Sequence, residues 1–228
     1  ERKHPDGFFI ARLPSEGRPL YELSVETWDG IERSRHDPYS FGSSLRQEDI
    51  DNLREVGSNV TYRILGAQHR PVDGIDGFRF AVWAPNARRV SVVGDFNNWD
   101  GRRHPMRLWQ NGGIWELFIP GLKAGAHYKY EIRGADGSLL PLKADPVAFA
   151  AQKPPETASV LQGTNDPVWH DENWMATRGE KDPRHIPISI YEVHLGSWAR
   201  VAEEGNRYLT YRELGERLIP YVKEMGFT

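Results

Sequence analysis

The chain contains no cysteine and no long apolar run. Without thiols it can form neither disulfides nor thiolate metal sites. No apolar stretch approaches the ~18 residues of a membrane-spanning helix, and no charged leader precedes an apolar segment. These absences are typical of a protein from a reducing compartment, so we expect a cytoplasmic location and no membrane partner.

An excess of charge of one sign is also missing. Lys and Arg total 29 and Asp and Glu total 32, which leaves a formal net charge of −3. A nucleic-acid-binding protein usually carries a basic patch or a high isoelectric point, so we expect no nucleic-acid partner. The sequence has no His-Glu-x-x-His motif and no glycine-rich phosphate loop, so we expect no metal and no cofactor.

Aromatic and turn-forming residues, in contrast, are plentiful. The chain has 8 Trp, 9 Tyr, 9 Phe, 22 Gly and 16 Pro, which indicates short strands joined by turns. Apolar and polar residues alternate in several segments, and Asp136-Gly137 is typical of a hairpin turn. The expected strands are 78–82, 90–94, 115–119, 128–132 and 139–143. Their spacing predicts a mainly β fold, an immunoglobulin-like β-sandwich.

The first 42 residues are similar to the second half of this module. Tyr21 and Asp29-Gly30 recur at one constant offset as Tyr128 and Asp136-Gly137. This recurrence predicts tandem modules, with residues 1–42 as the C-terminal remnant of a first β-sandwich. The alternative is that aromatic residues and Asp-Gly turns recur by chance in any β protein.

Residues 43–66 are interpreted as a helical linker between the two copies. Ser44 and Gln47 predict a capping box at the start of its helix. Gly57 predicts the C-terminal end of that helix. We expect this linker to dock against the sandwich and to carry no chemistry of its own.

After the sandwich the composition changes. Residues 164–187 are polar and are interpreted as an extended connection, and residues 188–195 predict an apolar strand. A Thr210–Glu213 capping box then begins a helix that ends at Gly226. One strand and one helix form a single β/α unit. Such a strand buries both faces only within a larger parallel sheet.

An ordered set of motifs carries a family resemblance. The motifs are Phe80-Ala81-Val82-Trp83-Ala84-Pro85-Asn86-Ala87, Val93-Gly94-Asp95-Phe96-Asn97-Asn98-Trp99, Gly113-Ile114-Trp115-Glu116-Leu117, Pro155-Glu156-Thr157-Ala158-Ser159 and Ile190-Tyr191-Glu192-Val193-His194-Leu195-Gly196-Ser197-Trp198. Together they closely resemble bacterial glycogen (1,4-α-glucan) branching enzymes. The resemblance implies two sandwich modules and a catalytic (β/α)8 barrel. Residues 67–163 are then a glucan-binding-type sandwich, and residues 188–228 are the incomplete start of the barrel.

The resemblance also implies a reaction. Such enzymes cleave an α-1,4 bond and transfer the segment to a 6-hydroxyl with retention of configuration, which requires two carboxyl groups about 5 Å apart. The family takes these carboxylates from barrel strands after the first. We therefore expect them beyond residue 228 and expect this chain, which lacks the rest of the barrel, to be inactive. Glu192 and His194, on the first barrel strand, are interpreted as structural.

A glucan-binding surface on the sandwich is the better functional candidate. An exposed Trp suits the C–H face of a sugar ring, and amide and ammonium groups suit its hydroxyls. In related glycogen-binding modules a matching Trp and Lys contact the glucan. The resemblance therefore assigns Trp99 and Lys129 to α-glucan binding, and more weakly Asn97 and Asn98. The second Trp of those modules is replaced by Ser138-Leu139-Leu140, which predicts a weak site.

Other interpretations stay open. Trp99 and residues 102–107 could dock the sandwich onto the barrel, which would make the module a structural spacer. A free-standing glycogen-binding module is a further alternative, against which the β/α unit argues. Trp83 and Trp115, on alternating strands, are expected in the core.

Overall fold

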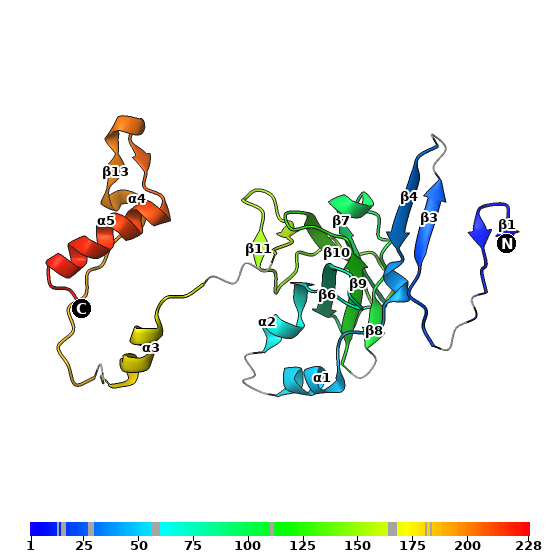
Figure 1. The fold of residues 1–228 in the computed structure, drawn as a ribbon, viewed down its shortest axis with the longest axis horizontal. Helices are drawn as coiled ribbons and strands as arrows, with labels where there is room; N and C mark the ends of the chain where they lie inside the picture. Colours follow the sequence, from blue (N-terminus) through cyan, green and yellow to red (C-terminus); the bar gives the residue numbers. More distant parts are fainter. Residues whose placement is uncertain are drawn as a thin grey trace. The chain divides into compact units, whose positions relative to one another are not determined.

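The structure is a computed structural model of the 228-residue chain (Figure 1). It describes residues 1–12, 14, 17–26, 30–55, 60–109, 112–163, 168–180, 182 and 184–228. The chain divides into two compact units, Glu1–Asn165 and Asp166–Thr228. Within the described ranges, no helix has both the length and the apolar character needed to cross a bilayer.

The first unit contains two four-stranded antiparallel sheets, which form a β-sandwich. One sheet has the order β5-β6-β9-β8 and the other the order β11-β12-β10-β7. The bounds of the strands are β5 Gly66–His69, β6 Gly77–Trp83, β7 Arg89–Gly94, β8 Arg107–Trp109, β9 Ile114–Pro120, β10 His127–Arg133, β11 Ala150–Ala151 and β12 Ser159–Val160. The four longest, β6, β7, β9 and β10, confirm the strands predicted from alternation.

Every second side chain of these long strands enters one shared core. Phe78, Phe80 and Val82 of β6 meet Tyr128 and Tyr130 of β10 there. The other members of the core are Ala67, Val90, Val92, Met106, Trp115, Leu117, Ile119 and Leu161. Each large apolar side chain buried in this way contributes roughly 1.5–3 kcal/mol. This layer therefore supplies much of the stability of the module.

The predicted strand 139–143 pairs only in part. The amide of Leu140 donates to the Ile132 carbonyl at 2.9 Å, and Lys143 exchanges two backbone hydrogen bonds with Tyr130. These are isolated bridges rather than a continuous ladder. The segment still lies along β10, as the Asp136-Gly137 turn predicted.

A buried carboxylate ties the next segment to the sandwich. The hydroxyls of Tyr128 and Tyr130 donate to Oδ2 of Asp145 at 2.7 and 3.0 Å. The amide of Val147 donates to Oδ1 at 2.9 Å, and the Asp145 amide donates to Oγ of Ser159. Burial raises the pKa of Asp145, and the three donors offset part of that rise. Asp145 thus connects β10, β12 and the chain between them.

The short helix η1 (Pro38–Ser40) precedes the predicted linker, residues 43–66, which contains α1 (Gln47–Arg54) and α2 (Thr61–Ile64). The predicted Ser44–Gln47 capping box is wrong. Both the amide and the hydroxyl of Ser44 donate to Oε1 of Glu116, at 2.8 and 3.0 Å, because that buried carboxylate needs donors.

The helix α1 begins two residues later than that capping box implied. Its cap is a hydrogen bond of 2.8 Å from the Arg46 amide to Oδ2 of Asp49. Gly57, predicted to end this helix, lies outside the described residues.

The N-terminal residues form two small hairpins. The strand β1 (Arg2–His4) pairs with β2 (Phe8–Phe9), and β3 (Glu22–Glu26) pairs with β4 (Glu32–His36), all antiparallel. The second hairpin leaves its apolar side chains about half exposed, at Leu23, Val25 and Ile31. A two-stranded hairpin buries too little apolar surface to be stable alone.

The second unit differs from the prediction in two respects. Residues 164–187, predicted as an extended connection, include the helix α3 (Glu172–Thr177). Residues 188–194 form no strand, and α4 (Leu195–Trp198) begins where the predicted strand was to end. A strand is held by hydrogen bonds to neighbouring strands, and no strand of the described chain pairs with this segment. The other elements of the unit are α3 (Glu172–Thr177), η3 (Arg178–Glu180), β13 (Arg200–Val201), η4 (Ala202–Glu204), β14 (Arg207–Tyr208) and α5 (Tyr211–Glu224).

Both predicted ends of α5 are confirmed. The Glu213 amide donates to Oγ1 of Thr210 at 3.3 Å, and the Thr210 amide donates to Oε2 of Glu213 at 2.7 Å, a reciprocal capping box. At the other end Gly226 has φ +80°, and the Phe227 amide donates to the Val222 carbonyl at 3.0 Å. This pattern is a Schellman motif, which requires a left-handed residue.

Replacing Asp145 by alanine tests the buried carboxylate. The change removes the acceptor of three hydrogen bonds and leaves two tyrosine hydroxyls unpaired in the core. We expect a loss of about 3 kcal/mol in the free energy of unfolding, measured by urea titration. Tyr130→Phe removes one donor and should cost about 1 kcal/mol. Equal urea midpoints for Asp145→Ala and the unaltered protein would contradict this account.

Candidate functional site

The turn after β7 positions most of the predicted binding residues. Asn97 is 1% exposed, and its amide is used inside the turn. Its Oδ1 accepts from the Gly94 amide at 2.9 Å, and its Nδ2 donates to the Val92 carbonyl at 2.9 Å. Asn97 therefore shapes the turn and offers no free polar atom to a surface ligand. Asn98, the next residue, is exposed.

Trp99 is held in an uncommon backbone conformation. Asn98 and Trp99 both have positive φ, 56° and 58°. Asn tolerates this region, but a bulky residue there costs about 1–3 kcal/mol and persists only when its surroundings hold it. The Trp99 amide donates to the Gly94 carbonyl at 3.1 Å, and its Nε1 donates to Oδ1 of Asp95 at 3.2 Å. The ring, 37% exposed, is thus fixed at the surface.

Asp95 is itself held by β10. Its Oδ2 accepts from the His127 amide at 3.0 Å and lies 2.9 Å from Nδ1 of the same residue. The backbone donor lowers the pKa of the Asp95 carboxyl below its ordinary value. The ionised carboxylate then links the Trp99 ring to the end of β10.

Lys129 lies on the outer face of the same sheet. Its neighbours Tyr128 and Tyr130 point into the core, so alternation turns Lys129 outward. Its Nζ donates to Oγ1 of Thr157 at 2.7 Å. Lys129 pairs with Val93, one register step from the pair formed by Gly94 and Tyr128.

Trp99 and Lys129 therefore occupy the same end of β7 and β10. The Gly94 carbonyl that accepts from the Trp99 amide belongs to the residue paired with Tyr128, the neighbour of Lys129. Together with Thr157 they place an aromatic ring, an ammonium and a hydroxyl in one region. Sequence analysis missed Thr157, because only the fold brings the chain before β12 beside β10.

Several residues after Trp99 make their contacts within the turn itself. Arg102 pairs with Asp100 through Nε at 2.9 Å and an Nη at 2.8 Å. A side chain at Gly101 would collide with the Glu131 carboxylate, so the turn packs closely on the sheet. Met106 is 5% exposed and belongs to the core. Of residues 102–107, Met106 therefore faces away from any docking surface.

The two tryptophans expected in the core have different positions. Trp115 is 6% exposed, and its Nε1 donates to the Ala84 carbonyl at 3.0 Å, which confirms its prediction. Trp83 is 62% exposed, so its prediction was wrong. Val82 pairs with Trp115 and points inward, and alternation along β6 therefore sends Trp83 to the outer face.

Residues that could suggest catalysis or metal binding show no such arrangement. Nδ1 of His194 lies 2.9 Å from Oγ of Ser197 at the start of α4, and Glu192 is exposed. Among the described residues, no group of three or more His, Asp or Glu could hold a metal ion.

Comparison with known proteins defines the class of the sandwich. Residues 64–148 match the family Carbohydrate-binding module 48 (Isoamylase N-terminal domain). The sandwich is therefore similar to modules of this class. Among solved structures, this chain is similar to Klebsiella pneumoniae pullulanase complexed with maltotriose. The match covers 49% of this chain and 11% of the pullulanase chain, at 25% identity and a TM-score of 0.35. That score is too low to support an argument on fold or ligand.

The particular relatives are bacterial branching enzymes. The chain is 54% identical over 227 residues to the 1,4-alpha-glucan branching enzyme GlgB of Paramagnetospirillum magneticum, covering 100% of this chain. It is 52% identical over 229 residues to the GlgB of Rhodospirillum rubrum, and 55% identical over 225 residues to a GlgB of Pseudomonas fluorescens. The resemblance carried by the motifs is thus confirmed. The chain spans 30% of the length of these relatives.

The link between Asp95 and Trp99 predicts a pH response. A depressed folded-state pKa means that the ionised carboxylate persists as pH falls, and that its interactions are lost as pH drops through that pKa. The Trp99 indole N–H resonance, followed by NMR, should therefore titrate with a midpoint below the ~3.9 of an unperturbed Asp. Trp99→Phe assigns the resonance. A midpoint at or above the unperturbed value would show that Asp95 does not hold the ring.

Proposed function

We propose that this chain is the N-terminal part of a cytoplasmic 1,4-α-glucan branching enzyme, whose sandwich binds or positions α-glucan. The parent enzyme cleaves α-1,4 bonds and transfers the cut segment to form α-1,6 branches in glycogen. The observation that carries this proposal is the 54% identity to a branching enzyme over the whole chain. The match of residues 64–148 to a carbohydrate-binding module supports the role of the sandwich.

The proposed domain organisation follows the family. Residues 1–42 complete a first sandwich, residues 43–66 link it to the module at 67–163, and residues 164–187 connect that module to the barrel, which begins at 188–228. Exposed apolar side chains at the two ends support this division. Ile188 is 58% and Ile190 81% exposed, which suits an apolar segment that packs within a barrel in the parent enzyme.

The chemistry of the proposed glucan site follows from its geometry. The Trp99 ring stacks on the C–H face of a glucose unit, while the Lys129 ammonium and the exposed Asn98 amide bond its hydroxyls. Asn97 supports this site by shaping the turn. The hairpin region carries Leu139 and Leu140 at the surface in place of a second aromatic ring. A single platform gives weak binding, which suits a surface that holds a polymer by repeated contacts.

Affinity electrophoresis in gels with and without glycogen tests the glucan site. The unaltered chain should be retarded by glycogen, and Trp99→Ala should reduce the affinity about tenfold or more by removing the stacking surface. Lys129→Ala should weaken retardation less, because its ammonium supplies hydrogen bonds without a stacking face.

Trp83→Ala is the matched control, since Trp83 is an exposed tryptophan on the other sheet. It should leave retardation unchanged. If neither the chain nor any variant is retarded, the sandwich does not bind glucan measurably and the docking interpretation replaces this one.

The proposed position of the catalytic residues predicts that this chain is inactive. The catalytic carboxylates are proposed to lie on barrel strands that residues 188–228 do not include. Incubation of the purified chain with amylose should leave the iodine absorbance spectrum unchanged, with a full-length branching enzyme as positive control. Any new α-1,6 linkage formed by the chain, detected by debranching and chain-length analysis, would overturn this assignment.

A further inference from the structure

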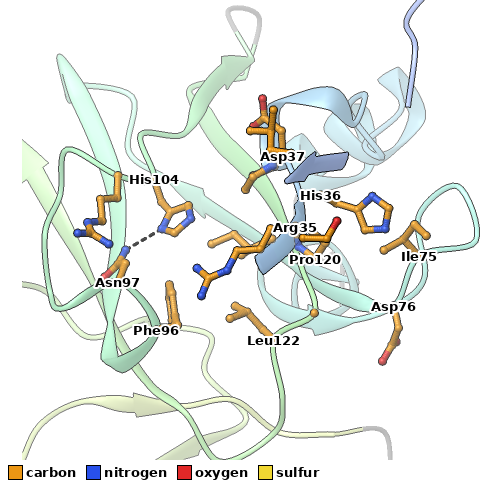
Figure 2. Close-up of a pocket in the computed structure, with 16 residues that line it drawn as sticks. Arg35, His36, Asp37, Ile75, Asp76, Phe96, Asn97, His104, Pro120 and Leu122 are labelled. Atoms are coloured by element: carbon orange, nitrogen blue, oxygen red, sulfur yellow. Dashed lines mark hydrogen bonds between the residues drawn. The ribbon is translucent and has the colours of Figure 1, made fainter. Parts of the chain in front are cut away.

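A cavity lies apart from the Trp99 surface. It has a volume of about 860 Å³ and lies between β4, the turn after β7 and the turn between β9 and β10 (Figure 2). Neither Trp99 nor Lys129 lines it. Its lining includes Arg35, Phe96, Arg103, His104 and Leu122. A cavity of this size accommodates a small molecule.

The carboxylates of the cavity already have donors. Asp37 accepts from the Tyr21 hydroxyl at 2.5 Å and from the Tyr39 amide at 2.9 Å. Asp76 lies 3.0 Å from Nε2 of His69. The negative charges in the lining are therefore largely satisfied within the protein, which leaves the guanidinium groups to determine what a ligand meets.

The two guanidinium groups, in contrast, have unused donors. Within the described residues, no hydrogen bond or ion pair is recorded for the side chain of Arg35, which extends into the cavity in Figure 2. Arg103 comes only within 3.9 Å of Asp100, a carboxylate that Arg102 already binds through two nitrogens. A surplus of guanidinium donors favours an anionic ligand, and the planar fork of Arg matches phosphate oxygens.

An imidazole adds a neutral hydrogen-bonding group. The Asn97 amide is oriented by the Gly94 amide, so its Nδ2 donates to Nδ1 of His104, at 2.8 Å. Burial and the nearby Arg103 lower the pKa of His104, so the neutral ring carries its proton on Nε2. This N–H suits a hydroxyl of the ligand.

The remaining walls are apolar. Phe96 and Leu122 line one side, and Ile119 and Pro120 continue from the end of β9. Figure 2 shows Phe96 and Leu122 on the side of the cavity toward which Arg35 extends. An aromatic ring beside apolar side chains fits the C–H face of a sugar ring.

We propose that this cavity binds a phosphorylated sugar. The phosphate lies between Arg35 and Arg103, a hydroxyl bonds His104, and the apolar face of the sugar packs on Phe96 and Leu122. This site goes beyond the proposed glucan surface, because it recognises a small anion rather than a neutral polymer and uses none of the same exposed side chains.

Isothermal titration calorimetry of the 228-residue chain with glucose 6-phosphate tests the proposal. We expect binding that weakens with added salt. Arg35→Gln and Arg103→Gln should each lower the affinity about tenfold or more, because each removes charge-assisted hydrogen bonds. Arg33→Gln, on the same strand as Arg35, is the matched control outside the cavity and should have little effect. Circular dichroism checks that each variant is folded.

Further ligands and one variant separate this site from the glucan surface. Trp99→Ala should bind glucose 6-phosphate as the unaltered chain does, even where it no longer binds glycogen. The proposal is overturned if glucose 6-phosphate does not bind at about 10 mM, or if the two cavity variants bind as tightly as Arg33→Gln. It is also overturned if inorganic phosphate or maltotriose binds as tightly as the sugar phosphate.

Discussion

The apolar layer shared by the two sheets determines where side chains point in this module. Because β6 and β9 lie in one sheet and β7 and β10 in the other, each long strand must present alternate residues to the same core. The residues between them must then face outward. The outward position of Lys129 and the exposure of Trp83 both follow from this constraint, as does the placement of the polar residues beneath the linker.

The outer faces of the two sheets are covered differently. On the β6–β9 sheet, Arg79 is 1% exposed, and burial lowers its pKa to about 10. Its Nη2 donates to the Arg63 carbonyl at 3.3 Å, and nearby Glu116 accepts from Ser44. The linker thus supplies partners for a polar layer that would be costly to bury alone. On the other sheet, Lys129 bonds Thr157, and no linker helix of the described first unit lies over it.

The local signals in the sequence predicted local structure well. The four long strands, the Trp115 position and both ends of α5 depend on alternation or on residues within one turn of each other. The prediction for Trp83 was wrong, although alternation along β6 indicates its position. Val82 and Trp83 are neighbours on one strand and cannot both face the core. The Ser44 cap failed for another reason, because its competitor Glu116 is distant in sequence. A strand at residues 188–194 needs partner strands, and no strand of the described residues pairs with this segment.

The candidate site was only partly visible in the sequence. The motif around Asn97 and Trp99 indicated a turn, but it did not separate the buried amide from the exposed ring. Thr157 and the cavity beside β4 depend on contacts between segments far apart in the chain. No periodicity predicts such contacts, because they arise only when the sheets have formed.

The turn after β7 contributes side chains to two separate surfaces. Trp99 lies on one of them, and Phe96, Asn97 and His104 line the cavity on the other. Asn97 bonds both the backbone that supports Trp99 and the imidazole of His104. A shift of this turn would therefore move the Trp99 backbone and the His104 imidazole together. Linkage would make any coupling between ligands of the two proposed sites equal in both directions.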